Sequence, residues 1–223
     1  MDAQISSSVA LVKSVMQLVL TKRRFVWKGP SRGWSVSLTF DDGPHPEYTI
    51  ACLELLRKYD MKATFFLIGK NAEKYPEIVK EIHQQGHALG IHTYSHPFTL
   101  HKMSFKRVKQ ELQRTQNIIH SATNQVVSIY RPPRGQLSIK LLFFSAILGF
   151  PIILWNISFL DHRQIGTEYL ISQIRAYSLK SGDIILLHDH NSYTIEALPV
   201  LLKRIRDKGL NSLTIPQMFG YGR

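Results

Sequence analysis

The sequence predicts an α/β fold built from parallel βα units. From Trp34 onward, short β-branched or apolar runs alternate with longer segments of helical character. The chain has 223 residues, 44% of them apolar, which is enough for one large core. Polar residues follow most of the apolar runs, as expected where the carboxyl ends of parallel strands share one edge. A closed barrel and an open doubly wound sheet both accommodate this pattern.

Seven runs have the length and composition of strands. They are short, rich in apolar and β-branched residues, and bounded by polar or turn-forming residues. The expected strands cover residues 35–40, 63–68, 88–94, 126–131, 152–159, 183–188 and 213–217.

Six longer segments between these runs predict helices. In the third of them, Phe105, Val108, Leu112 and Ile119 recur on one helical face. The expected helices cover residues 48–59, 76–85, 104–121, 138–148, 168–179 and 195–208.

Residues 34–223 are expected to form one domain, because no repeat, low-complexity tract or long linker interrupts them. Residues 1–33 form an N-terminal extension, in which residues 10–20 predict a short amphipathic helix followed by Lys22, Arg23 and Arg24. This helix is too short to span a bilayer, which takes about 20 apolar residues, and it lacks the basic leader of a signal peptide. It either packs on the domain or lies on an anionic membrane surface.

The chain is basic, with 28 Lys and Arg against 16 Asp and Glu and a formal net charge of +12. A basic surface attracts nucleic acid, anionic lipid or anionic polymer. The charges are scattered and form no stripe interleaved with aromatic residues, so nucleic acid is not an expected partner. The single cysteine, Cys52, excludes an intrachain disulfide and occupies an apolar helical position, where we expect a buried thiol.

Two histidines and two adjacent acids indicate a metal centre. His92 and His96 lie four residues apart in HTYSH, and Asp41 and Asp42 are adjacent in TFDDGP. On a helix, or on a strand that runs into a turn, this spacing lets two imidazoles meet one ion. Two histidines and one carboxylate leave coordination positions open, as catalytic metal sites do. The pattern leaves open which acid binds the ion.

The remaining acid and three further residues indicate hydrolysis. A carboxylate left free beside the ion can take a proton from an attacking water. Arg131, in RPPRG, can pair with that base and keep it ionised. His188, in LLHD, can give a proton to a leaving amine, and Asp161 is a candidate partner that fixes its tautomer and raises its pKa.

Five segments resemble the ordered motifs of the polysaccharide deacetylases, the carbohydrate esterases of family four that share the nodulation-protein deacetylase homology domain. They are TFDDGP at 39–44, HTYSH at 92–96, RPPRG at 131–135, WNISFLD at 155–161 and LLH at 186–188. The resemblance covers nearly all of residues 34–218. It implies a distorted (β/α) barrel of about seven parallel strands, and metal-dependent removal of N-acetyl groups from N-acetylglucosamine units of a glycan.

The resemblance also implies a role for each matched residue. Asp41 would be the catalytic base, oriented by Arg131, and His188 would be the acid, assisted by Asp161. The cofactor would be a divalent metal, zinc first, with cobalt or nickel as substitutes. Its ligands would be Asp42, His92 and His96.

Four residues are expected to bind substrate by the same resemblance. The backbone N–H of Arg134 would face the oxyanion, and a backbone donor survives a change of side chain. Leu186 would contact the acetyl methyl group, and Pro133 would lie beside the substrate in the RPPRG motif. His162 stands where the family usually has Trp, so one wall of the pocket is altered.

Three functions are consistent with the sequence. The leading one is a deacetylase acting on chitooligosaccharide or peptidoglycan. The second is an amidase on another amide-bearing or lipid-linked sugar, which peripheral membrane contact through the basic N-terminal segment would suit. The third is a non-catalytic carbohydrate-binding protein, which normally lacks the base or a metal ligand. We expect a cytoplasmic or membrane-associated protein, or one of the cell envelope if the substrate is peptidoglycan. The sequence does not indicate an oligomeric state.

Overall fold

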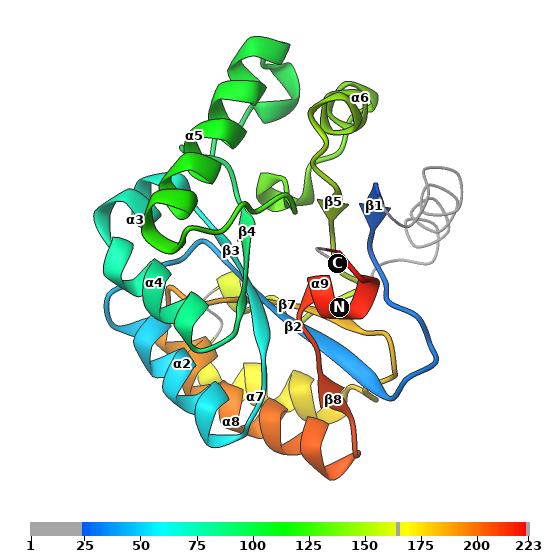
Figure 1. Cartoon of the computed structure of the whole chain (residues 1–223). Helices are drawn as coiled ribbons and strands as arrows, with labels where there is room; N and C mark the ends of the chain where they lie inside the picture. The colour runs from blue at the N-terminus through cyan, green and yellow to red at the C-terminus, as the bar shows by residue number, and fades with distance from the viewer. Residues whose placement is uncertain (1–23, 164–165, 222–223) are drawn as a thin grey trace.

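Parallel strands form a distorted α/β barrel in the computed structural model, which describes residues 24–163 and 166–221 (Figure 1). The main sheet has the strand order β4-β3-β2-β7-β6, and all its pairs are parallel. Its strands are β4 (Ala88–Ile91), β3 (Ala63–Leu67), β2 (Ser35–Asp41), β7 (Ile184–His188) and β6 (Ile157–Ser158). The fold class predicted from the sequence is confirmed.

A second pair of parallel strands continues the wall. β1 (Phe25–Val26) pairs with β5 (Ile152–Ile153). Tyr130 joins this pair to the main sheet, because it bridges both Ile91 at the end of β4 and Ile152 in β5. All seven residues of β2 are buried, as expected for a parallel strand covered on both faces.

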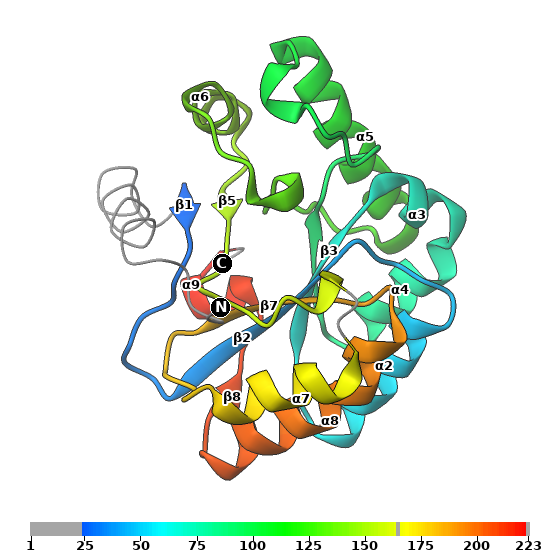
Figure 2. The ribbon, with the colours of Figure 1, turned by 180° about the vertical axis from the view of Figure 1, so that it is seen from behind.

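Helices cover the outside of the barrel in two groups. α2, α7 and α8 lie together on one side, and α3, α4 and α5 lie together on another (Figure 1 and Figure 2). The helices are α2 (Tyr48–Lys58), α3 (Gly69–Lys74), α4 (Pro76–Gln84), α5 (Phe105–Thr123), α6 (Ile139–Leu148), α7 (Thr167–Ala176), α8 (Ser192–Asp207) and α9 (Ile215–Phe219). All six helices predicted from the sequence are present. The short α3 and α9 were not predicted.

Four expected strands differ from the structure. The strand expected at residues 88–94 ends at Ile91, and the chain turns at Thr93, which has a positive φ. In residues 126–131, Tyr130 alone makes β-bridges, and residues 152–159 divide into β5 and β6. Residues 213–217 are not a strand, because the Thr214 side chain and Gln217 form a capping box that starts α9, with Pro216 in its first turn. The strand of this region is β8 (Asn211–Ser212), which pairs with the start of β2.

The sheet begins upstream of Trp34. Phe25 and Val26 are fully buried and Trp27 nearly so, and β1 lies in the wall beside β5. The helix predicted at residues 10–20 lies outside the described residues. Among the described residues, no helix has the length and apolar character needed to cross a membrane.

Candidate active site

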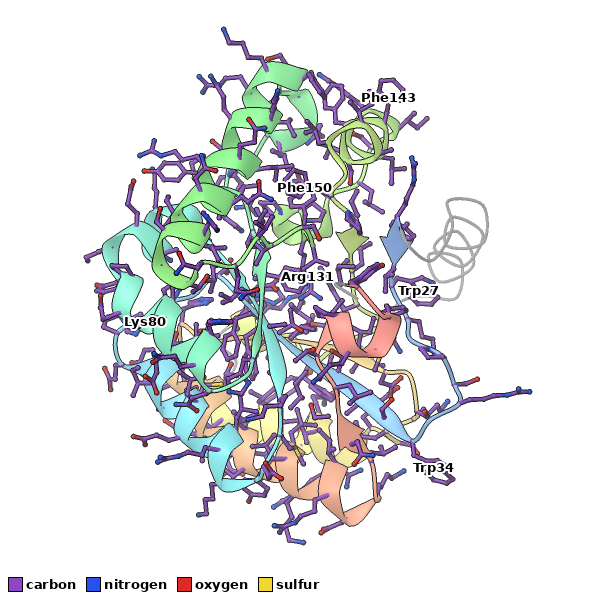
Figure 3. All side chains as sticks on the ribbon, in the orientation of Figure 1. Trp27, Trp34, Lys80, Arg131, Phe143 and Phe150 are labelled. Carbon is purple, nitrogen blue, oxygen red and sulfur yellow. The ribbon has the colours of Figure 1, made fainter. Side chains whose placement is uncertain are left out.

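Polar side chains gather where the strands of the barrel end. β2 ends at Asp41, β7 ends at His188, and His92 directly follows β4. Arg131 directly follows Tyr130 and lies in the middle of the molecule (Figure 3). The topology therefore brings together residues from four of the five sequence motifs, as the parallel arrangement predicts.

Arg131 holds the side chain of Asp41 in place. Its Nη1 donates to Asp41 Oδ1 over 2.7 Å and to Thr39 Oγ1 over 2.9 Å. The other two guanidinium nitrogens donate to the main-chain carbonyls of Ile153 (3.0 Å) and Leu154 (3.1 Å). Arg131 is fully buried and Asp41 is 3% exposed, so this is a buried, hydrogen-bonded ion pair.

Burial and charge act in opposite directions on Asp41. Burial raises the pKa of its carboxyl group, while Arg131 and then His188 lower it, and the net direction is upward. Burial also lowers the pKa of Arg131, against the effect of Asp41. A carboxylate with a raised pKa accepts a proton more readily than an exposed one, which suits a general base.

Asp42, His92 and His96 place one oxygen and two nitrogens around a single point. Asp42 Oδ1 lies 3.4 Å from Nε2 of each histidine, and the three candidate ligand atoms lie within 4.8 Å of one another. His92 Nδ1 lies 2.8 Å from the carbonyl oxygen of Arg131, which leaves Nε2 facing this point. Burial lowers the pKa of His92 to about 3, against the effect of Asp42, so the ring is neutral and able to act as a ligand.

The chemistry of these atoms fits a divalent cation. Asp42 Oδ1 is buried, yet no described residue donates a hydrogen bond to it. Such an unsatisfied buried carboxylate oxygen is costly unless a cation pairs with it. One carboxylate and two imidazoles are a donor set that zinc accepts, with positions left over for water and substrate.

The loop between the two histidines is held by Glu111 of α5. Its Oε2 accepts hydrogen bonds from the backbone N–H of Tyr94 (2.9 Å) and of Ser95 (2.8 Å), and Oε1 accepts from Ser95 Oγ (2.9 Å). The loop needs this support, because Thr93 and His96 both have positive φ, at 65° and 50°. Sequence reasoning missed Glu111, since it is one charged residue among many on α5.

His188 and Asp161 form a second buried acid–imidazole pair. His188 Nδ1 lies 2.9 Å from Asp161 Oδ1, and the His188 backbone N–H donates to Asp161 Oδ2 over 2.7 Å. Thr194 Oγ1 also donates to Oδ2. Burial alone would lower the pKa of His188, but the charge and hydrogen bond of Asp161 raise it to about 9. The ring is therefore protonated at neutral pH and has a proton to give.

Comparison with known proteins identifies the family. The family model described as polysaccharide deacetylase matches residues 28–153, more than half of the chain. The chain belongs to the polysaccharide deacetylase family. The predicted resemblance and the predicted enzyme class, a polysaccharide deacetylase, are confirmed.

Individual relatives of this deacetylase act on two kinds of glycan. A peptidoglycan-N-acetylglucosamine deacetylase of Bacillus cereus is 33% identical over 202 residues, covering 89% of this chain and 73% of the relative. A chitooligosaccharide deacetylase of Azorhizobium caulinodans is 36% identical over 156 residues, covering 70% of this chain and 73% of the relative.

Solved structures share the barrel. The crystal structure of a peptidoglycan N-acetylglucosamine deacetylase has a TM-score of 0.84 at 32% identity, covering 91% of this chain and 96% of that one. A pseudoenzyme of carbohydrate esterase family 4 from Bacillus anthracis has a TM-score of 0.81 at 27% identity, covering 91% of this chain and 71% of that one. The fold is thus used both by deacetylases and by a relative described as a pseudoenzyme.

Two of the residues expected to bind substrate lie in, or close to, the strand that ends at His188. Leu186, 3% exposed, is in β7 between Thr39 and Ser158 of the neighbouring strands. The His162 ring is exposed and lies 5.4 Å from the His188 ring.

The other two expected residues lie in a 3-10 turn (Pro133–Gly135) of the RPPRG motif. Pro133 is buried, and Arg134 is exposed with φ 57°. Gly135 follows at φ 64°, and a Cβ there would lie 2.7 Å from the Trp155 ring. The motif therefore ends in glycine both for its backbone conformation and for its close approach to Trp155.

Two polar residues after His188 also border the centre of this deacetylase. Asp189 is fully buried, accepts a hydrogen bond from Thr49 Oγ1, and lies against Gly43 of the TFDDGP loop. Burial raises its pKa to about 7. His190 Nδ1 lies 3.7 Å from Asp42 Oδ2. Asp189 directly follows β7, and the motif pattern did not indicate that His190 would lie beside Asp42.

Proposed function

We propose that this deacetylase is a metal-dependent hydrolase that removes N-acetyl groups from N-acetylglucosamine units of a glycan, either peptidoglycan or a chitooligosaccharide. One observation carries the proposal. The buried Arg131–Asp41 pair lies next to the atoms of the Asp42, His92 and His96 cluster, with Asp41 Oδ2 3.8 Å from His92 Nε2. A base and a group of metal-binding atoms thus share one buried centre.

Asp42, His92 and His96 would hold the divalent cation. We propose zinc, with cobalt or nickel able to substitute, because neutral imidazole and carboxylate donors suit all three. When bound, the cation supplies Lewis acidity to the acetamide carbonyl.

The side chains divide the proton transfers between them. Asp41 takes a proton from the water that attacks the acetamide carbon, and Arg131 keeps its carboxylate oriented for this step. His188 then gives its proton to the nitrogen as the C–N bond breaks, and Asp161 stabilises the imidazolium until that moment. The products are acetate and a glycan that carries a free amine.

The residues around the centre would select the substrate. The Arg134 backbone N–H would donate to the oxyanion that forms when water adds to the carbonyl. Leu186 would contact the acetyl methyl group. Pro133 and His162 would flank the sugar, with an exposed imidazole in the place of the indole that the family usually has.

A non-catalytic, carbohydrate-binding role is the alternative from a different class. It would be favoured by the loss of the base or of a metal ligand. Asp41, Asp42, His92 and His96 are all present, and the base is paired with a buried guanidinium, so catalysis is favoured.

Acetate release tests the proposal. Three proteins are compared: the metal-stripped wild type, the zinc-reloaded wild type and a zinc-reloaded Asp41→Asn variant. Each is incubated with N-acetylglucosamine oligomers and with peptidoglycan fragments. Mass spectrometry then measures the masses of the products. We expect loss of acetyl groups with the reloaded wild type, loss that is slower by about 100-fold or more with reloaded Asp41→Asn, and none with the metal-stripped protein. Reloaded wild type that leaves both glycans unchanged would redirect the assignment to another amide-bearing or lipid-linked sugar, or to the binding role.

A further inference from the structure

α6 carries an exposed apolar stripe that the proposed reaction does not use. Ile139, Phe143 and Ile147 are spaced four residues apart and so lie on one helical face. They are 88%, 61% and 57% exposed. Phe143 lies at the outer edge of the molecule (Figure 3). Exposed apolar residues that are contiguous, and not scattered singly, mark interaction surfaces.

The opposite face of α6 attaches it firmly to the fold. Leu141 and Ser145 are buried, and the Phe144 ring packs edge-on against Phe105 at the start of α5, with 4.8 Å between ring centroids. The Ser138 side chain caps the helix at its N-terminus, and Gly149 ends it in the left-handed conformation. The stripe is therefore presented by a packed helix with defined ends.

The region that presents the stripe is strongly basic. Residues 98–148 contain eight Lys and Arg residues and a single acid, Glu111, which is already hydrogen-bonded to the ligand loop. Arg131 is buried. The other seven are exposed, and Arg114 among them is paired with Glu73. The six exposed cations that remain are Lys102, Lys106, Arg107, Lys109, Arg134 and Lys140. Apolar side chains among cations, on an element that does not span a membrane, are the composition that anionic lipid surfaces attract.

The stripe follows the RPPRG motif of the candidate active site closely in the sequence. The guanidinium of Arg134 lies over the ring of Phe98, 3.5 Å from its centroid, and Phe98 is 75% exposed. Ile139 begins α6 only a few residues after Arg134. A surface that touched both Phe98 and α6 would therefore lie next to Arg134 of the RPPRG motif.

The described part of the chain begins next to the segment that follows α6. Arg24 accepts a hydrogen bond from the Ile152 backbone N–H over 2.9 Å, just beyond the end of α6, and β1, β5 and α6 are neighbours in both ribbon views (Figure 1 and Figure 2). The sequence before Arg24 contains an apolar run at residues 10–20 followed by Lys22 and Arg23. In the sequence, a second apolar stretch followed by cations thus comes shortly before β1.

We propose that the exposed face of α6, together with Phe98, docks the enzyme on an anionic phospholipid bilayer. Ile139, Phe143 and Ile147 enter the boundary between headgroups and acyl chains, and the surrounding cations meet lipid phosphates. Docking is a property of this surface alone, so it holds or fails independently of the reaction proposed above.

Vesicle sedimentation with the full chain tests the proposal. Vesicles of phosphatidylcholine alone are compared with vesicles that also contain phosphatidylglycerol. The test variant combines Ile139→Gln, Phe143→Gln and Ile147→Gln. The control is Trp34→Gln, because Trp34 is 72% exposed and lies at the opposite end of the molecule from Phe143 (Figure 3).

We expect the wild type to bind the anionic vesicles, and to bind less as salt rises. The triple variant should partition at least about 10-fold more weakly, because it has lost its apolar contact area, while Trp34→Gln should match the wild type. The triple variant should keep its circular dichroism spectrum, since all three side chains are exposed. If it does not fold, Phe143→Gln alone and Lys140→Glu serve in its place.

Three results would overturn the proposal. The first is wild-type protein that stays in the supernatant with anionic vesicles. The second is a wild-type dimer in sedimentation velocity that the triple variant converts to a monomer, which would assign the stripe to a second copy of the chain. The third is a triple variant that binds vesicles like the wild type but melts at a lower temperature, which would mean that the chain itself covers the stripe.

Discussion

Arg131 reaches Asp41 across 90 positions of sequence and donates a 2.7 Å hydrogen bond to its Oδ1 inside the barrel. The guanidinium is held on its other side by the carbonyls of Ile153 and Leu154 and lies over the Phe66 ring. The orientation of the proposed base is therefore fixed by strand ends and not by a mobile surface contact.

Replacing Arg131 should destabilise the protein as well as reduce its activity. Arg131→Met leaves Asp41 buried without its partner, and breaking a buried ion pair in this way costs about 3–5 kcal/mol in free energy of unfolding. Urea denaturation measures this cost. The control is Arg114→Met, which breaks an exposed pair with Glu73 and should cost at most about 1 kcal/mol. Equal costs for the two variants would contradict the structural role of Arg131.

Asp41→Asn should separate catalysis from metal binding. The amide is similar in size to the carboxylate but cannot take the proton, so activity should fall by about 100-fold or more, the usual contribution of a general base. Metal content, measured by atomic emission, should stay at the wild-type level, since Asp41 is not among the three clustered ligand atoms. Full activity in this variant would refute the base assignment.

Removal of a metal ligand should abolish both metal binding and activity. Asp42→Ala and His96→Ala each delete one of the three clustered donor atoms, so we expect the purified proteins to contain little zinc and to release no acetate. Titration of the metal-stripped variants with zinc measures the loss of affinity. A variant that binds zinc as tightly as the wild type would remove that residue from the ligand set.

Glu111 should affect the metal through the loop that it holds. Glu111→Gln removes the charge that strengthens the hydrogen bonds from the Tyr94 and Ser95 N–H groups, and its amide NH2 cannot accept from Ser95 Oγ. Changes to residues that position metal ligands typically weaken metal affinity about 10–100-fold. The matched control is Glu73→Gln, because Glu73 accepts from the Tyr94 hydroxyl and does not touch the loop backbone. Zinc affinity that is unchanged in Glu111→Gln, or equally reduced in Glu73→Gln, would exclude this role.

The His188–Asp161 pair should make the metal-free protein less stable at alkaline pH. The pKa of His188 is about 9 in the folded state and about 6.5 when unfolded, so the folded state binds the proton more tightly. The stabilisation is complete below about pH 6.5 and is lost as the pH rises through about 9, a change of about 3 kcal/mol. Urea denaturation between pH 6 and 10 measures it. Asp161→Asn should flatten this dependence, and an equally steep curve would contradict the pairing.

The sequence predicts the strand-end residues of the site well, because parallel strands gather their carboxyl ends whatever the details of packing. Thus Asp41, His92, Arg131 and His188 could be expected together before any coordinates. Glu111 could not, since its role depends on where α5 passes the ligand loop, and that is decided by tertiary packing.

Short elements were the other failure of sequence reasoning. β1 has two residues, too few for an alternating pattern, and its strand character depends on pairing with β5. The segment at 213–217 has an apolar composition that suits a strand, but the capping box of Thr214 and Gln217 makes it a helix. In both places the deciding interaction is one that composition and periodicity do not record.

β1 also sets the order in which the protein can be completed during synthesis. It is the first described strand to leave the ribosome, yet its partner β5 is translated more than a hundred residues later. Until then Phe25 and Val26 have no partner strand, and their apolar side chains are not yet buried in a complete core. The barrel wall is therefore completed by the first of the described strands to be synthesised, and a chain released before residue 153 leaves β1 without its partner strand.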